Sequence, residues 1–305
     1  MSLAFTPLSS KFGAVVEGLD LRGGVSAPEA ASLRDGLARH RVLSIPAPEA
    51  GPDEFLAIAR AFGELEPFFL SAYSLESHPE IYVLSNIRKD GAPIGRDGAG
   101  FHWHSDHTFQ DRPCSATLLH GVTCPSEGGD TLFVDMVDAY ERLSEAERRR
   151  LDGLRAVHKY QKKEFAFTAE RGADAETAAK IENLKRLRAE EDAARPPSAS
   201  SAASGAVPEV AHPVVRTHPV TGEKALYLNE EMTTGIEGMA EAEGRALLRD
   251  LAVHATPDEN ILRYKWKTGD IVIWDNASTM HSATYTDPAC DRLMHRLTIR
   301  GEEPF

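Results

Sequence analysis

Two residue types that bind transition metals lie close together in the stretch Phe101–Phe109, which reads FHWHSDHTF. His104 and Asp106 are separated by one residue, and alternate side chains of a β-strand point to the same face. We therefore expect a strand that aims an imidazole and a carboxylate at one point. This pair suits Fe(II) or Mn(II) as well as zinc. An accidental pair on a polar strand is the alternative, so a third ligand is needed to decide.

His281 is the best third ligand among the 12 histidines. It follows the apolar segment Asp270–Asn276, DIVIWDN, in which a strand and a turn are expected. Taken alone, a histidine at such a place is more often structural. Together with His104 and Asp106 it would complete a facial triad, which leaves the remaining positions of an octahedral metal open.

Two arginines follow in the segment Arg292–Arg296, RLMHR. On a strand, alternate residues share a face, so both guanidinium groups would point into one pocket. Arginine presents a planar fork that matches a carboxylate. The pair therefore predicts a pocket for an anionic cosubstrate and an anionic substrate beside the metal. Arginines exposed on an edge strand are the alternative.

The elements that must position these residues are expected to be mainly strands. Short apolar runs bounded by glycine and proline predict strands at 42–46, 81–85, 116–122, 131–134, 225–228, 260–264, 270–274, 280–284 and 292–300. Apolar periodicity predicts helices at 28–41, 52–62, 135–151 and 240–254. The glycine-rich residues 88–100 are expected to form a mobile loop that leads to His104. This pattern predicts a mainly β, α+β fold with flanking helices, of the sandwich or jelly-roll type.

A single domain over residues 1–305 is expected, because no repeat and no clear boundary is visible. Residues at about 164–211 read as an insertion, since 174–194 are helix-prone and highly charged and 196–206 are low in complexity. Such an insertion is either a lid or a flexible decoration, and the sequence leaves both open.

The overall composition is that of a globular protein with an acidic balance. There are 34 basic and 47 acidic residues, for a net charge of −13. This balance argues against partners such as nucleic acid or an anionic membrane. The three cysteines (Cys114, Cys124 and Cys290) are too few for a disulfide framework and predict reduced thiols. No signal peptide or apolar span is visible, so a cytoplasmic protein is expected. A homo-oligomer remains possible.

Four motifs occur in a fixed order along the chain. They are Trp103–Asp106 with Thr108 and Phe109, Gly128–Thr131, Trp274–Asn276 with His281, and Arg292–Arg296. The spacing is 27 residues from His104 to Thr131 and 11 from His281 to Arg292. This order resembles the taurine dioxygenase family of Fe(II)/2-oxoglutarate-dependent oxygenases, over essentially the whole chain except 164–211.

The resemblance implies a double-stranded β-helix, or jelly roll, and a set of roles at the matching positions. His104, Asp106 and His281 would be the Fe(II) ligands. Arg292 and Thr131 would bind the distal carboxylate of 2-oxoglutarate, and O₂ would be the second cosubstrate. Chemistry would then rest on the iron centre, with no separate acid or base residue.

The resemblance also implies that Arg296 holds an anionic group of the primary substrate. Phe69 and Tyr73 would line the pocket, with core packing as the alternative. His102 adjoins the ligand pair, and Met232 stands where family members often have an aromatic residue. These departures make taurine itself an unexpected substrate. We expect a small or medium carboxylate, sulfonate or amino-acid-like molecule.

Hydroxylation of an unactivated C–H bond, with release of succinate and CO₂, is the expected reaction. Asp106 argues against halogenation, which in related enzymes needs a small residue at that position. Desaturation or oxidative decarboxylation would use the same parts. Two other classes stay open: a metal-binding jelly-roll module without turnover, and a zinc hydrolase, which would need a nearby general base.

Overall fold

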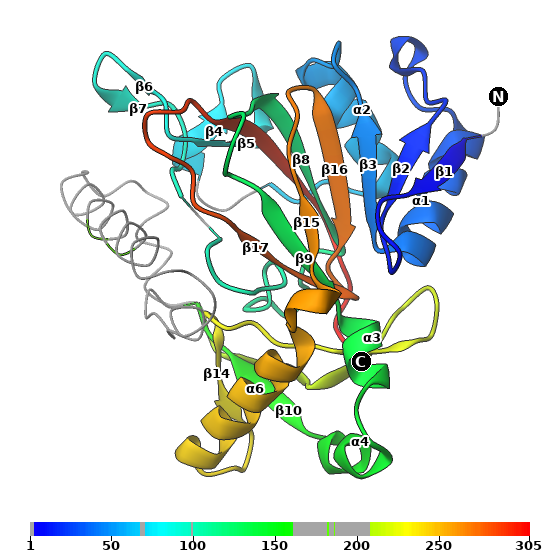
Figure 1. The fold of residues 1–305 in the computed structure, drawn as a ribbon, viewed down its shortest axis with the longest axis vertical. Coiled ribbons are helices and arrows are strands. Elements are labelled where there is room, and N and C mark those ends of the chain that lie inside the picture. Colours follow the sequence, from blue (N-terminus) through cyan, green and yellow to red (C-terminus); the bar gives the residue numbers. More distant parts are fainter. Residues whose placement is uncertain (1–2, 68–70, 99, 161–181, 183–185, 187–207) are drawn as a thin grey trace.

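The computed structural model describes residues 3–67, 71–98, 100–160, 182, 186 and 208–305. Its largest element is an eight-stranded sheet (Figure 1). In order across the sheet, the strands are β1 (Ala4–Pro7), β2 (Ala14–Glu17), β3 (Val42–Pro46), β16 (Asp270–Asp275), β8 (Ala116–Thr123), β18 (Leu293–Ile299), β5 (His78–Ser85) and β4 (Ser74–Leu75). Only β2 and β3 pair in parallel; the other neighbours are antiparallel.

A second sheet contains β15 (Leu262–Tyr264), β9 (Thr131–Asp135) and β17 (Thr279–Ala283), with β9 in the middle. Residues of both sheets share one apolar cluster, in which Phe133 of β9 packs on Trp274 of β16 with ring centroids 5.5 Å apart. The two sheets therefore enclose an interior, as the predicted jelly roll requires. The mainly β, α+β fold class is confirmed.

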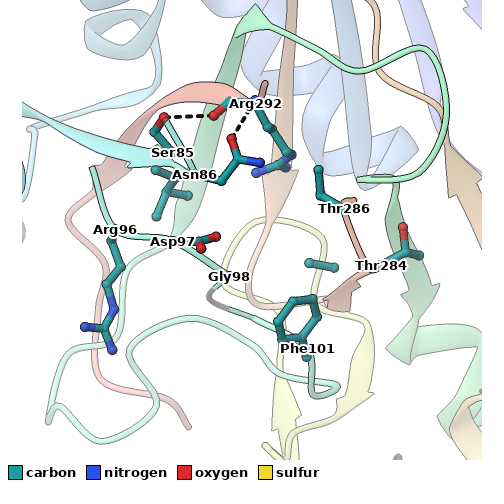
Figure 2. Close-up of a pocket in the computed structure, with 11 residues that line it drawn as sticks. Ser85, Asn86, Arg96, Asp97, Gly98, Phe101, Thr284, Thr286 and Arg292 are labelled. Carbon is teal, nitrogen blue, oxygen red and sulfur yellow. Dashed lines mark hydrogen bonds between the residues drawn. The ribbon is translucent and has the colours of Figure 1, made fainter. Parts of the chain in front are cut away.

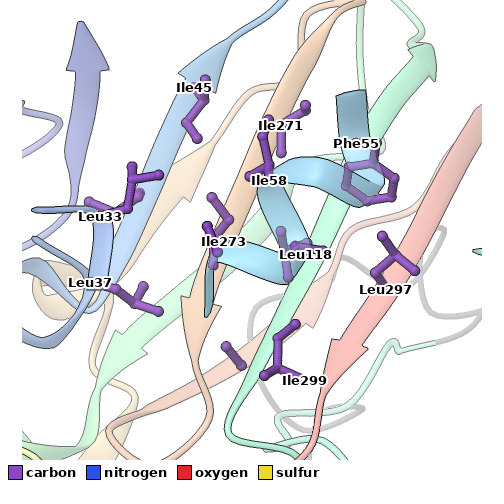
Figure 3. Packing of buried hydrophobic residues seen from close by; sticks show 14 of the residues in the cluster. Leu33, Leu37, Ile45, Phe55, Ile58, Leu118, Ile271, Ile273, Leu297 and Ile299 are labelled. Carbon is purple, nitrogen blue, oxygen red and sulfur yellow. The ribbon is translucent and has the colours of Figure 1, made fainter. Parts of the chain in front are cut away.

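Helices α1 (Ala27–His40) and α2 (Pro52–Phe62) cover the outer face of the large sheet. Side chains of α1 (Leu33) and α2 (Phe55, Ile58) pack on Ile273 and Leu118 of the sheet (Figure 3). Successive strand residues point to opposite faces, and β16 follows this rule: Ile271 and Ile273 face the helices, whereas Val272 and Trp274 face the interior.

A further layer lies beyond the second sheet. It contains the helices α3 (Met136–Glu141), α4 (Glu145–Leu151) and α6 (Glu241–Ala255), and the strands β10 (Arg155–His158), β11 (Val210–Pro213), β12 (Val215–Thr217), β13 (Lys224–Leu226) and β14 (Thr233–Ile236). Strand β10 lies between β11 and β14, and β12 pairs with β13. Short 3₁₀ helices are η1 (Leu21–Gly23), η2 (Ser71–Tyr73) and η5 (Asp258–Asn260).

Two sequence-based expectations were wrong in detail. The single helix predicted at 135–151 is two helices, because Ser144 caps α4: its hydroxyl accepts from the backbone N–H of Glu147, whose carboxylate accepts from the N–H of Ser144. The loop predicted at 88–100 contains the hairpin of β6 (Arg88–Lys89) and β7 (Ala92–Pro93). The insertion predicted at about 164–211 lies almost entirely outside the described residues, which leave out 161–181, 183–185 and 187–207; β11 begins at its end.

A helix that crosses a bilayer must be both long and apolar. None of the helices in the described part of the chain meets both requirements.

Candidate active site

His104, Asp106 and His281 converge at one end of the interior. One ligand atom from each lies within 4.8 Å of the others. The Nε2 atoms of His104 and His281 are 3.8 and 3.7 Å from the two Asp106 carboxylate oxygens. These distances exceed hydrogen bonding, so both nitrogen lone pairs remain available to a metal. Among the described residues, this is the one group of three potential ligands with such spacing.

The backbone brings the histidines together. His104 and His281 exchange two backbone hydrogen bonds, of 3.0 and 2.9 Å, in an isolated antiparallel bridge. The strand predicted for the His104–Asp106 stretch was wrong, because residues 106–109 form a turn with His107 in the left-handed region (φ 58°). The turn, rather than strand alternation, directs Asp106 toward the histidines.

Each imidazole is held in an orientation that suits metal binding. Nδ1–H of His104 donates to the backbone carbonyl of His102 at 2.6 Å, which leaves Nε2 as the lone-pair nitrogen. The ring of His281 packs on Trp274 with centroids 4.6 Å apart. Burial lowers the pKa of His281 well below its ordinary value, so the ring is neutral, as a ligand must be.

Asp106 is a buried carboxylate in a polar cage. Arg296 donates to its Oδ1 and the Thr117 hydroxyl to its Oδ2, both at 2.7 Å. Burial alone would raise the pKa of Asp106, but the positive charge of Arg296 lowers it far below the ordinary value. The carboxylate is therefore ionised at any physiological pH.

This donor set fits a first-row divalent metal. Two imidazole nitrogens and one carboxylate on neighbouring sides of a point are the protein part of a 2-His-1-carboxylate site. Ligands on adjacent octahedral positions stand about 3 Å apart when metal–ligand bonds are about 2.1 Å. The separations of 3.7 and 3.8 Å are close enough for small side-chain movements to reach that geometry.

A pocket lined by Arg292 lies next to the triad; Figure 2 shows its lining. Ala283 of this lining is two residues after His281, and a Cβ at Gly100 would lie 4.0 Å from Ala283 and 3.2 Å from the His104 ring. Its lining includes Leu84, Asn86, Phe101, Ala283, Thr286 and Arg292. The backbone of Arg292 is fixed by Ser85 and Asn86, whose side chains bond its carbonyl and its N–H at 2.9 and 2.8 Å. Burial lowers the pKa of the Arg292 guanidinium, and the charge of Asp97, which also lines the pocket, partly offsets this. Within the described residues no carboxylate lies within ion-pair distance of Arg292. A cation so placed suits an anionic ligand.

The Gly128–Gly129 turn lets Arg292 occupy this position. Gly129 has φ +67°, and a Cβ there would lie 3.1 Å from Nε of Arg292 and 2.9 Å from the Thr286 hydroxyl. A Cβ at Gly128 (φ +72°) would lie 2.8 Å from the Tyr285 carbonyl. Both the backbone conformation and the close approach therefore require glycine.

Thr131 begins β9 two residues after Gly129. Strand pairing places it opposite Ala283, in the same alternation as Phe133 opposite His281. Thr131 and Ala283 therefore face the same side as His281, and Ala283 lines the pocket. The Thr131 hydroxyl accepts a hydrogen bond from Trp266 Nε1 at 3.0 Å, which leaves its own proton available to an acceptor.

The structure supports the predicted substrate contacts to different degrees. Arg296 is half-buried and faces the interior opposite Tyr82, where its guanidinium reaches Asp106. Tyr73 makes an edge-on contact with Tyr82, with centroids 6.2 Å apart. Arg296 and Tyr73 therefore both lie next to Tyr82, and Arg296 also contacts Asp106 of the triad.

The other three predicted substrate contacts receive less support. His102 is buried and reaches the site through its carbonyl. Met232 has backbone hydrogen bonds to the Asn229 side chain and to Lys159. The Asn229 amide also donates to the Ser105 carbonyl at 3.0 Å, so Met232 is linked to the triad stretch through Asn229. Phe69 lies outside the described residues. Sequence analysis missed Thr117 as a partner of Asp106, because a threonine inside an apolar strand carries no signal of its own.

Comparison with known proteins gives a consistent result. The family model described as "Taurine catabolism dioxygenase TauD, TfdA family" matches residues 4–298. The chain is 32% identical over 308 residues to the alpha-ketoglutarate-dependent 2,4-dichlorophenoxyacetate dioxygenase of Cupriavidus pinatubonensis, covering 98% of each chain. It is 29% identical over 309 residues to the alpha-ketoglutarate-dependent sulfate ester dioxygenase of Pseudomonas putida, covering 100% of this chain and 91% of that one. The crystal structure of AAD-2 in complex with Mn(II) and N-oxalylglycine matches with a TM-score of 0.74 at 28% identity, covering 100% and 99%.

Proposed function

Since the chain belongs to the TauD, TfdA family of dioxygenases, we propose that it oxidises a C–H bond of a small anionic organic substrate. It is an oxidoreductase that depends on Fe(II), 2-oxoglutarate (alpha-ketoglutarate) and O₂. This excludes the non-catalytic module and the zinc hydrolase that the sequence left open. Relatives named for a phenoxyacetate and for a sulfate ester support an anionic substrate of the carboxylate, sulfonate or related type.

The observation that carries the proposal is the convergence of His104, Asp106 and His281 beside a pocket lined by Arg292. In our proposal these three residues hold Fe(II). When bound, Fe(II) and 2-oxoglutarate would activate O₂, which is the oxidant, and 2-oxoglutarate would be converted to succinate and CO₂. The chain's own residues bind, orient and shield the reactants.

Arg292 and Thr131 would hold the distal carboxylate of 2-oxoglutarate. The guanidinium offers a two-pronged donor to that carboxylate, and the Thr131 hydroxyl, whose acceptor side is taken by Trp266, offers a further proton. Phe101 and Leu84 add apolar surface to the lining of this pocket. The contacts with Arg292 and Thr131 would set the orientation of 2-oxoglutarate before the substrate binds.

Arg296, which also donates to Asp106, would bind the anionic group of the substrate. Tyr73, beside Tyr82, would supply an aromatic wall. Hydroxylation is the outcome we favour, because it needs no group beyond those assigned here. Desaturation or oxidative decarboxylation would require a different substrate pose, and no described residue of the site favours such a pose.

We also propose a cytoplasmic enzyme that acts as one domain over residues 1–305. A net charge of −13 supports the absence of nucleic-acid and membrane partners, and one family model spans residues 4–298. A homo-oligomer remains a prediction.

The test is anaerobic addition of Fe(II) and 2-oxoglutarate to the purified protein. The chelate should give a weak visible charge-transfer band. His104→Ala and Arg292→Ala should lose it, whereas the matched variants His40→Ala, on α1, and Arg300→Ala, at an exposed position just after β18, should retain it. No band in folded, iron-loaded wild-type protein, or equal bands in all variants, would show the assignment to be wrong.

A further inference from the structure

Asp106 lies in a turn, so regular strand pairing does not fix its carboxylate. Another group must therefore orient it. Asn276, at the end of β16 on the large sheet, contacts the turn at two points. Its Oδ1 accepts from the backbone N–H of Asp106 at 3.2 Å, and its carbonyl accepts from the Ser105 hydroxyl at 2.7 Å. These bonds tie the turn to a rigid strand.

The amide nitrogen of Asn276 is linked to the Asp106 carboxylate through Thr117. Nδ2–H of Asn276 donates to the Thr117 hydroxyl oxygen at 2.9 Å and to Sγ of Cys114 at 3.3 Å. A threonine hydroxyl has one proton. Because the amide already donates to its oxygen, that proton points to Oδ2 of Asp106, 2.7 Å away.

Asn276 is itself held firmly. Its backbone N–H donates to the carbonyl of Ser115 at 2.9 Å. The preceding residue, Asp275, accepts from the N–H of Ala277 at 2.7 Å and from the Ser278 hydroxyl at 3.0 Å, and it also pairs with the buried His218. The junction between β16 and β17 therefore cannot rotate without breaking several buried bonds.

From this geometry we infer that Asn276 is a positioning residue for the metal: through the Thr117 hydroxyl it fixes the rotation of the Asp106 carboxylate and the lone pair that each oxygen presents. The inference rests on the proposed role of Asp106 as a ligand. Thr117 takes one lone pair of Oδ2 and Arg296 one of Oδ1, so the lone pairs left over point toward His281 and His104.

A purely structural role is the competing explanation, because Asn276 and Thr117 are both almost fully buried. The two explanations differ in what a substitution changes. A structural role predicts a lower melting temperature and an unchanged affinity for metal. A positioning role predicts weaker metal binding, which a restored hydroxyl should rescue.

The experiment measures the Kd for Mn(II) and the melting temperature of Thr117→Val, Thr117→Ser, Asn276→Ala and the Thr117→Val/Asn276→Ala double variant. Loss of a partner of a metal ligand typically weakens metal binding about 10- to 100-fold. We expect that range for Thr117→Val and for Asn276→Ala, and a Kd within about threefold of the wild type for Thr117→Ser. The loss of affinity in the double variant should be much smaller than the product of the two single losses, because both substitutions act on one contact.

Asn260→Ala is the matched control, since Asn260 is a buried asparagine with its own side-chain bonds on η5. It should lower the melting temperature without changing the Kd. Equal Kd values for Thr117→Val, Thr117→Ser and wild type would overturn the inference, and this pair suffices if Asn276→Ala does not fold. Failure of the proposed function looks different: the wild type would not bind Mn(II), or His104→Ala would bind it equally well.

Discussion

Replacement of Gly129 by alanine tests whether Arg292 holds 2-oxoglutarate. Gly129 has φ +67°, a conformation that costs a residue with a Cβ about 1–2 kcal/mol. The new methyl would also lie 3.1 Å from Nε of Arg292 and 2.9 Å from the Thr286 hydroxyl, so the arginine must move by a few tenths of an ångström. The substitution therefore combines backbone strain with a displaced guanidinium.

The size of the effect follows from these two parts. A hydrogen bond to a charged group contributes about 1.5–3 kcal/mol. A displaced Arg292 guanidinium would lose part of this contribution. We expect a loss of about 1.4 kcal/mol, or a tenfold higher Kd for 2-oxoglutarate. The Kd for Mn(II) should stay within about twofold of the wild type, because no triad residue touches Gly129.

The assay is titration of the anaerobic Fe(II) protein with 2-oxoglutarate, monitored by the charge-transfer band, together with urea unfolding. Gly222→Ala is the matched control, since Gly222 has φ +74° and a Cβ added there would meet no atom within 4 Å. Both variants should lose about 1–2 kcal/mol of stability through backbone strain, with a further loss in Gly129→Ala from its close contacts, and only Gly129→Ala should bind 2-oxoglutarate more weakly. Equal affinities in the two variants would refute the placement of the cosubstrate against Arg292.

Three further predictions concern substrate, pH and packing. Arg296→Gln should abolish succinate release with anionic substrates, while the chelate band should need about 10- to 100-fold more Fe(II), because Arg296 also holds Oδ1 of Asp106; normal turnover would remove Arg296 from substrate binding. Burial lowers the pKa of His295 to about 4 from an ordinary value near 6.5, so its contribution to stability is complete above pH 6.5 and is lost as the pH falls toward 4. The loss is about 2 kcal/mol at pH 5, and His295→Leu should show a smaller difference in unfolding free energy between pH 7.5 and pH 5; an unchanged difference would contradict this account. Phe55→Ala should cost about 3–5 kcal/mol because the ring is fully buried between α2 and the large sheet, and a loss below about 1 kcal/mol in urea unfolding would show that the helix is not held by this contact.

The parts of the fold that sequence analysis predicted well are those with local signals. Helix α2 has the predicted bounds because Pro52 suits the first turn and Gly63 follows the last residue. The division between α3 and α4 was missed although its signal is also local: Ser144 and Glu147 form a capping box inside a continuous helical pattern. The apolar periodicity of the two helices concealed the break.

The site was predictable to a different degree for each kind of contact. The residues proposed as metal ligands were selected from residue types and spacing, and the structure brings all three together. The pairing of Arg296 with Asp106 was not predicted, because it joins residues 190 positions apart. Such contacts depend on strand order, and no pattern within one strand reports which strand becomes its neighbour.

Strand register explains how packing at a distance controls the site. On β17, Met280 packs in the layer with α3 and α6, and His281 faces the interior beside Trp274. Pairing with β9 sets Met280 opposite Val134 and His281 opposite Phe133. A slip of one residue would turn Met280 inward and remove His281 from the triad. Since Met280 and Val134 are both almost fully buried in an apolar cluster, such a slip would also expose or misplace their side chains. The apolar residues on the outer face of β9 and β17 therefore hold His281, a proposed metal ligand, in register.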